Sequence, residues 1–188
     1  MKKGLITLSI VIVFLFGIFG YLKFQYNRLV QLDQKVKEAW AQVENVYQRR
    51  NDLIPNLVAT VKGYAKHEKE VFLKVTEART KWQNAKTVRE KEIAAGEIES
   101  AISRLLLIVE NYPELKANEN FLALQDELAG TENRIAVERR RYNQAVREYN
   151  RIVKTFPTFL FARLFGFDIE KPYFKAVKGA EKPPEVKF

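Results

Sequence analysis

The chain has 188 residues, of which 29% are charged, and its formal net charge is +9 with an isoelectric point near 9.6. It contains no cysteine, which excludes disulfides, thiolate metal sites, a lipoprotein signal and a cysteine nucleophile. Acidic residues are interspersed with basic ones from Asp33 to Glu148, a mixture typical of solvated helical surfaces.

The first element is an apolar run from Gly4 to Leu22, flanked by Lys2, Lys3 and Lys23. As a helix it would cover roughly 28 Å, close to the bilayer hydrocarbon thickness of about 30 Å. A cleaved signal peptide is the alternative, but its apolar part runs about 7 to 15 residues and ends in a small-x-small site. Residues 1–24 are therefore predicted to be a transmembrane anchor. The residues chosen to represent it are Gly4, Leu5, Ile10, Val13, Phe16, Gly20 and Leu22.

Apolar residues recur at three-and-four spacing through the rest of the chain, which predicts an all-α soluble part. The stripe from Leu29 to Tyr47 belongs to a first helix. Because no Pro or Gly lies between Tyr21 and Arg50, this helix should continue the anchor as a stalk.

Asn51, Asp52 and Pro55 predict a break, since Asn or Asp caps a new helix and Pro is tolerated in its first turn. A second helix should run from there to about Ala85. Glu68 falls on its apolar stripe, where an apolar residue is expected.

Thr87 and Glu90 predict a capping box that starts a third helix with a stripe from Ile93 to Val109. Pro113 marks the next turn, because the residue before a proline is pushed out of the helical region.

A fourth helix of about 35 residues should carry the stripe from Phe121 to Val153. Gly130 within it suggests a close helix–helix approach. Short connections favour an antiparallel up-and-down bundle of about four long helices over residues 25–155.

In such a bundle the fourth helix returns to the membrane, where the chain reads FPTFLFARLFGF at 156–167. Two interpretations stay open for residues 156–175: a short aromatic helix that caps the bundle, or a helix in the membrane interface. The contact residues would be Phe156, Phe159, Phe161, Phe165 and Phe167. Residues 176–188 are expected to be a flexible tail.

Motifs for catalysis, metal or nucleotide binding are missing from the sequence. His67 is the single histidine and stands in HEKE rather than HExxH. Glu68, Thr131 and Arg139 are candidates for a buried polar network, for which an interhelical ion pair explains the positions better than catalysis does. We expect no cofactor, no metal and no catalytic residue.

The basic cluster of Arg139, Arg140 and Arg141 comes without the interleaved aromatic residues and reading motif that nucleic-acid binding would require. No nucleic-acid partner is expected.

Three segments resemble the signature segments of the bacterial LemA family. They are QRRNDLIPNLVATVKGYAKHEKEVFLKVTEAR at 48–79, YPELKANENF at 112–121 and LQDELAGTENRIAVERRRYNQAVREYN at 124–150. The resemblance implies one N-terminal membrane helix followed by a long-helix bundle, and no established catalytic activity. One member of the family is associated with magnetosome membrane formation, which favours a role in membrane organisation.

These observations predict a non-enzymatic, single-pass cell-membrane scaffold whose partners are the lipid membrane and further copies of itself. The alternative is an adaptor or regulator of another envelope protein, such as a membrane protease. An enzyme that uses Glu68 is a remote third hypothesis. The compact basic N-terminus slightly favours an extracytoplasmic bundle, although long domains translocate despite their charge.

Overall fold

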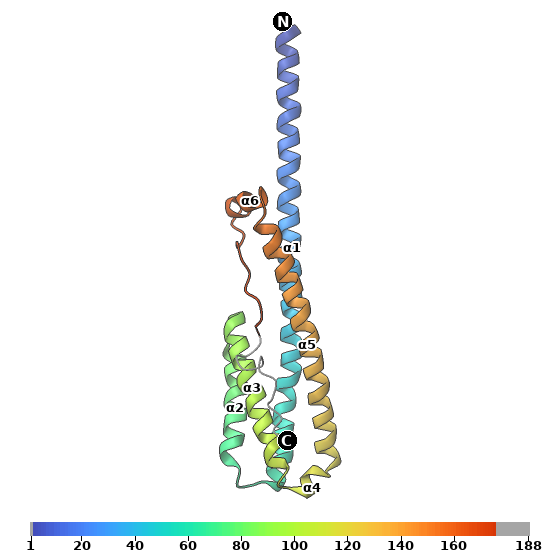
Figure 1. Cartoon of the computed structure of the whole chain (residues 1–188), viewed down its shortest axis with the longest axis vertical. Helices are drawn as coiled ribbons and strands as arrows, with labels where there is room; N and C mark the ends of the chain where they lie inside the picture. Colours follow the sequence, from blue (N-terminus) through green and yellow to red (C-terminus); the bar gives the residue numbers. More distant parts are fainter. Residues whose placement is uncertain (1, 176–188) are drawn as a thin grey trace, which may run out of the picture. The chain divides into compact units, whose positions relative to one another are not determined.

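The computed structural model describes residues 2–175, and every regular element in this range is a helix. The all-α prediction is therefore confirmed over this range. The helices are α1 (Lys2–Tyr64), α2 (Lys69–Asn84), α3 (Val88–Val109), α4 (Pro113–Lys116), α5 (Glu119–Val153) and α6 (Thr158–Leu164) (Figure 1). The chain divides into two compact units, one of Met1–Ala39 with Asn143–Lys171, here called unit 1, and one of Trp40–Tyr142 with Pro172–Phe188, here called unit 2.

Unit 2 is a helical bundle in which successive long helices run in opposite directions. Arg49 pairs with Glu127 and Arg50 with Glu132, so α1 and α5 lie side by side. Lys81 of α2 pairs with Glu97 of α3 at 2.7 Å. The core between the helices is apolar and includes Val43, Leu57, Val61, Phe72, Val75, Ile98, Leu105, Leu128 and Ile135.

The predicted break at Asn51, Asp52 and Pro55 is wrong, because α1 continues through Pro55 to Tyr64. A proline inside a helix removes one hydrogen bond and costs about 3 kcal/mol. Pro55 lies on the exposed side of α1, while Ile54 beside it is buried. Burial of the continuing apolar stripe outweighs the missing bond.

The turn that ends α1 lies at residues 65–68 instead. The amide of Ala65 donates to the carbonyl of Val61 at 2.9 Å, and Ala65 itself is fully buried. The second helix therefore begins at Lys69 rather than near residue 51.

The predicted capping box at the start of α3 is confirmed. The amide of Glu90 donates to the Thr87 hydroxyl, and a carboxylate oxygen of Glu90 accepts from the amide of Thr87, both at 3.1 Å. The close approach expected at Gly130 is not present, because a Cβ placed there would meet nothing within 4 Å among the described atoms.

Unit 1 contains the N-terminal part of α1, the last part of α5, α6 and the segment that follows α6. Lys35 of α1 pairs with Glu148 of α5 at 2.5 Å. Leu29, Val36, Val146, Tyr149 and Val153 are buried between the two helices. α1 has no break between the apolar run and this contact, which confirms the predicted continuous helix.

Candidate membrane-interface site

The first part of α1 is an apolar helix whose side chains face outward. It is the one helix in the described part of the chain that is long and apolar enough to cross a membrane, and 6% of its most apolar window is buried. Of the predicted anchor residues, Gly4, Ile10, Val13, Phe16 and Gly20 are exposed and Leu22 is half-buried. The side chain of Leu5 lies outside the described residues. Apolar surface left uncovered over this length is typical of a lipid-facing helix.

α6 packs against α1 directly after the exposed length. Thr158 and Ala162 are its buried residues, and Phe161 meets Tyr21 edge-on with 5.9 Å between ring centroids. The ring of Tyr26 of α1 packs edge-on against Phe165 and Phe167, with centroid distances of 5.2 Å and 5.8 Å. Three of the five predicted phenylalanines thus form one aromatic cluster with two tyrosines of α1. Edge-to-face pairs of this kind contribute about 0.5–1.5 kcal/mol each beyond the area they bury.

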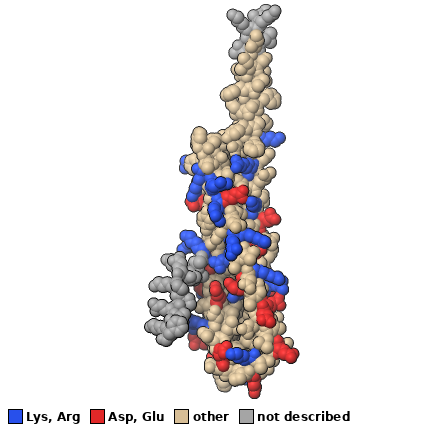
Figure 2. Space-filling view, turned by 45° about the vertical axis from the view of Figure 1, so that its right-hand side comes forward, with Lys and Arg blue, Asp and Glu red and all other residues tan. Residues whose placement is uncertain are grey.

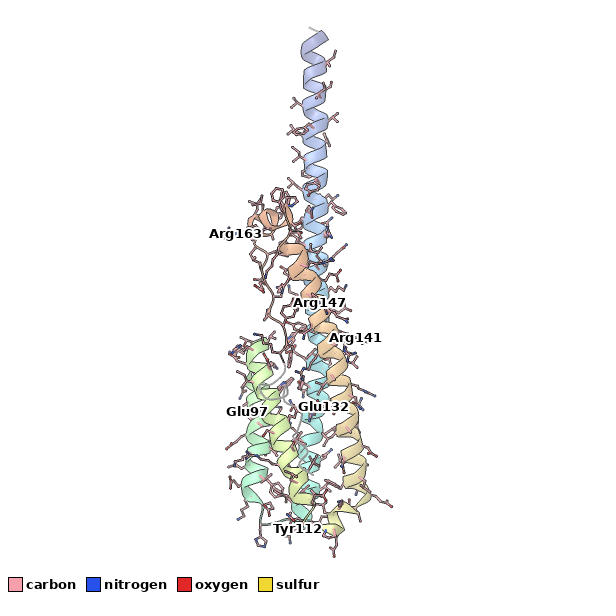
Figure 3. All side chains as sticks on the ribbon, in the orientation of Figure 1. Glu97, Tyr112, Glu132, Arg141, Arg147 and Arg163 are labelled. Carbon is pink, nitrogen blue, oxygen red and sulfur yellow. The ribbon has the colours of Figure 1, made fainter. Side chains whose placement is uncertain are left out.

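The other face of α6 is apolar and uncovered. Leu160 and Leu164 lie at four-residue spacing on this face, and Leu164 is 74% exposed; Phe156, in the turn before the helix, is 84% exposed. Phe159 is half-buried, with the guanidinium of Arg163 5.3 Å from its ring. Arg163, labelled in Figure 3, belongs to α6 and is exposed. α6 therefore presents apolar side chains both to α1 and to its surroundings.

Gly166 ends α6 and turns the chain back. Its φ of +74° lies in the left-handed region, where a side chain would be strained. The amide of Phe167 donates to the carbonyl of Ala162 at 2.9 Å and that of Gly166 to Arg163 at 3.3 Å, the bonds of a Schellman motif. The motif directs Phe167 onto Tyr26.

The segment after α6 is held on α5 by two polar side chains. The Tyr149 hydroxyl donates to the carbonyl of Asp168 at 2.7 Å. The buried amide of Asn150 bonds both backbone groups of Lys171, donating to its carbonyl at 2.9 Å and accepting from its N–H at 2.7 Å. Burial raises the pKa of Tyr149 to about 12, against the opposing charge of Lys171, so this phenol stays protonated as a donor.

Lys171 also joins this segment to α1 through a cluster of charges. Its ammonium lies 2.8 Å from Asp33 and 2.5 Å from Asp168, and Asp33 accepts a second pair from Lys37 at 2.8 Å. Burial works to raise the pKa of Asp33, but hydrogen bonds from Lys171 and Lys37 outweigh it and hold the pKa below its usual range. Burial likewise opposes the charge on Lys171, and the two carboxylates raise its pKa nonetheless.

The predicted polar network of Glu68, Thr131 and Arg139 is not brought together. Glu68 is the half-buried N-cap of α2, since the turn at residues 65–68 removes it from the apolar stripe. Thr131 is buried and donates to the carbonyl of Leu128 at 2.8 Å. Arg139 donates to the carbonyl of Lys175 at 3.1 Å and lies over the ring of Phe174.

Other polar residues occupy the core of unit 2, and sequence reasoning did not place them there. Arg50 is buried and pairs with Glu132, which is labelled in Figure 3. Asn51 beside it is 1% exposed, and neither polar atom of its amide has a hydrogen-bond partner among the described residues. The signal was available, because residues 50 and 51 follow Val43 and Tyr47 at helical spacing.

Phe174 was also missed as a core residue. It is 4% exposed and stacks on Tyr47 with 6.2 Å between ring centroids, and it meets Trp40 in a tilted arrangement at the same centroid distance. Among the described residues no group of three or more His, Asp and Glu side chains could hold a metal ion.

The model of the LemA family matches residues 39–188, which is most of the chain. The chain belongs to the LemA family. The matched range includes α6 and the return segment, whereas the apolar run of α1 precedes it.

Named relatives of this LemA-family chain fall into two groups. Magnetosome protein MamQ 1 of Paramagnetospirillum magneticum is 24% identical over 188 aligned positions, covering 86% of this chain and 69% of the relative. Magnetosome protein MamQ of Magnetospirillum gryphiswaldense is 23% identical with the same coverage. Protein LemA of Metamycoplasma hominis is 26% identical over 133 positions, covering 70% of this chain and 61% of the relative.

Proposed function

We propose that this protein is a non-enzymatic, single-pass membrane scaffold that self-associates and organises or remodels the cell envelope membrane. It contacts the bilayer twice, through the apolar length of α1 and through α6. The observation that carries the proposal is the arrangement of α6, which packs Phe161 on Tyr21 and leaves Leu160 and Leu164 uncovered. Phe156, in the turn before α6, is uncovered as well.

An uncovered apolar face is costly in water, since burying a Leu or Phe side chain contributes about 1.5–3 kcal/mol. Beside a membrane-spanning helix the acyl chains supply that burial. A short, largely apolar helix placed there acts as an interfacial helix and occupies area in one leaflet. Similarity to magnetosome proteins supports a role at membranes.

Cysteine labelling tests the second membrane contact, because the chain has no thiol of its own. Leu164→Cys and Leu107→Cys form a matched pair, since the two leucines are 74% and 69% exposed in the protein. In lipid nanodiscs a membrane-impermeant maleimide should label the Leu107 variant quickly and the Leu164 variant at least tenfold more slowly. Equal rates would refute contact between α6 and lipid.

Self-association and remodelling need separate measurements. Full-length protein should give ladders of itself on crosslinking in cells and should change the shape of liposomes after reconstitution. A monomer in detergent that leaves liposome shape unaltered would refute the scaffold. A single foreign crosslinked band would favour the adaptor instead.

The bundle is proposed to lie outside the cytoplasm. Protease added to intact cells should then degrade residues after Lys23, and protection until the cells are lysed would reverse the orientation.

A further inference from the structure

The positive charge of the chain is concentrated in unit 1. Residues 23–39 and 143–171 carry nine Lys or Arg against five Asp or Glu, a net charge of +4. Residues 40–142 and 172–175 carry eighteen against sixteen, a net charge of +2 over more than twice the length. The part that includes α6 is therefore the more basic one.

Most carboxylates of unit 1 already have lysine partners. Glu148 pairs with Lys35 and Glu170 with Lys154, while Asp33 and Asp168 share Lys171. Five cations of the described part of unit 1 are left without an acidic partner. They are Lys23, Arg28, Arg147, Arg151 and Arg163.

Three of these cations lie where lipid headgroups begin, and we call Lys23, Arg28 and Arg163 the basic belt. Lys23 follows the apolar run directly, and Arg28 lies about 9 Å beyond Leu22 at helical rise. The headgroup layer is about 5–8 Å thick on each side, which long Lys and Arg side chains reach easily. Figure 2 shows the described apolar length of α1 without charged side chains, and Lys and Arg, interspersed with Asp and Glu, from the level of α6 onward.

An apolar groove lies next to the basic belt. It has a volume of about 600 Å³ and runs between one face of α1, from Val13 to Leu22, and Phe161 of α6. Tyr21 is the lining residue whose side chain carries a polar group, the hydroxyl. That hydroxyl accepts from Gln25 Nε2 at 2.8 Å, so its own proton remains available to an external acceptor.

We propose that this groove and the basic belt bind an anionic phospholipid. One acyl chain lies along α1 beside Phe161, and the Tyr21 hydroxyl donates to a headgroup or ester oxygen. Arg28 follows Tyr21 by seven residues on the groove side of α1 and meets the lipid phosphate, while Lys23 and Arg163 add positive charge to the same headgroup layer. The proposal rests on the membrane contact of α6 proposed above and adds the class of lipid. Charge selects the anionic headgroup, and continuity of the groove with the lipid-facing surface of α1 selects an acyl chain.

Native mass spectrometry of the full-length protein in a non-ionic detergent tests the proposal. The probes are phosphatidylglycerol, phosphatidylcholine of the same chain length, and soluble glycerol phosphate. Each Lys or Arg near an anionic lipid strengthens binding roughly fivefold. The triple variant Lys23→Gln, Arg28→Gln, Arg163→Gln should therefore bind phosphatidylglycerol at least tenfold more weakly and phosphatidylcholine almost unchanged.

The matched control removes the same charge from exposed cations of unit 2, through Lys66→Gln, Arg134→Gln and Arg140→Gln. It should leave lipid binding within twofold of the unmodified protein. Gly17→Leu tests the groove, because Gly17 lines it and a Cβ there meets nothing within 4 Å, so a larger side chain would take up space in the groove. It should weaken both lipids, since it removes room for the acyl chain.

Equal affinity for the two phospholipids, or an equal loss in the control variant, would overturn the proposal. Glycerol phosphate that competes as well as the lipid would show a free phosphate site instead of a lipid site. The labelling experiment separates this inference from the proposed function. A protected Leu164→Cys without lipid preference refutes the anionic site alone, whereas a freely labelled one refutes the membrane contact itself.

Discussion

Asp33 provides a quantitative test of how the segment after α6 is attached. Its carboxylate is 13% exposed and receives ammonium groups from both Lys171 and Lys37 at 2.8 Å. Asp33→Asn keeps the shape and removes the charge. Exposed ion pairs contribute about 0–1 kcal/mol, and loss of one partner from a fully buried pair costs about 3–5 kcal/mol. Because Asp168 remains beside Lys171, we expect a loss of about 1–2 kcal/mol in the free energy of unfolding.

The pH dependence distinguishes charge from packing. The pKa of Asp33 is lower in the folded protein, so its contribution is complete above the unfolded pKa of about 4 and is lost as pH falls through the folded value. The pKa of Lys171 is raised, so its own contribution is complete below about pH 10 and does not end in acid. The difference in free energy of unfolding between the unmodified protein and Asp33→Asn should therefore be complete at pH 7. It should shrink as the pH falls below about 4.

Thermal unfolding followed by circular dichroism, with full-length protein in an uncharged detergent, measures this difference. For a chain of this size 1 kcal/mol shifts the midpoint by roughly 2–4 °C, so we expect a decrease of about 2–8 °C at pH 7. Asp126→Asn, at an exposed position, is the control and should change the midpoint by less than about 1 °C. A difference that persists unchanged in acid would refute the ion-pair account.

Two further substitutions probe the core of unit 2. Asn51→Leu removes a buried amide without hydrogen bonds among the described residues, a group that costs about 1–3 kcal/mol, and should raise the thermal midpoint. A lower midpoint would show that the amide is satisfied in solution. Phe174→Ala should cost about 3–5 kcal/mol and reduce the near-ultraviolet signal of the packed aromatic rings, because it empties a site between Trp40 and Tyr47. A loss below 1 kcal/mol would mean that Phe174 is not packed there.

Periodicity and capping chemistry were enough to predict the long helices. The stripe from Phe121 to Val153 became α5, and Thr87 with Glu90 placed the start of α3 to the residue. The break predicted at Pro55 was wrong because the local helix-start signal of Asn51, Asp52 and Pro55 was given more weight than the longer apolar stripe. The stripe that includes Tyr47, Ile54 and Leu57 keeps its phase through the proline, and burial along that stripe is worth more than one backbone hydrogen bond.

The polar interactions could not be predicted in the same way, because they join residues far apart in sequence. Tyr149 belongs to the predicted apolar stripe and Asn150 follows it without a pattern of its own, yet both side chains bind the backbone about twenty residues later. Lys171 gave no pattern of its own, and its partner Asp33 precedes it by 138 residues. These contacts form only because the Schellman turn at Gly166 reverses the chain and brings residues 168–171 beside α5 and α1.

The two interpretations of the aromatic segment, cap and interfacial helix, are compatible in the structure. Capping uses the face of α6 that carries Thr158, Phe161 and Ala162, and membrane contact would use the face with Leu160 and Leu164. A seven-residue helix is too short to be stable alone and needs burial on at least one side. With apolar residues on nearly all sides and one charge at Arg163, α6 uses α1 for that burial, and its second face stays uncovered in the structure. The anchor and α6 would then enter the membrane together, because the aromatic cluster around Tyr21 and Tyr26 joins them.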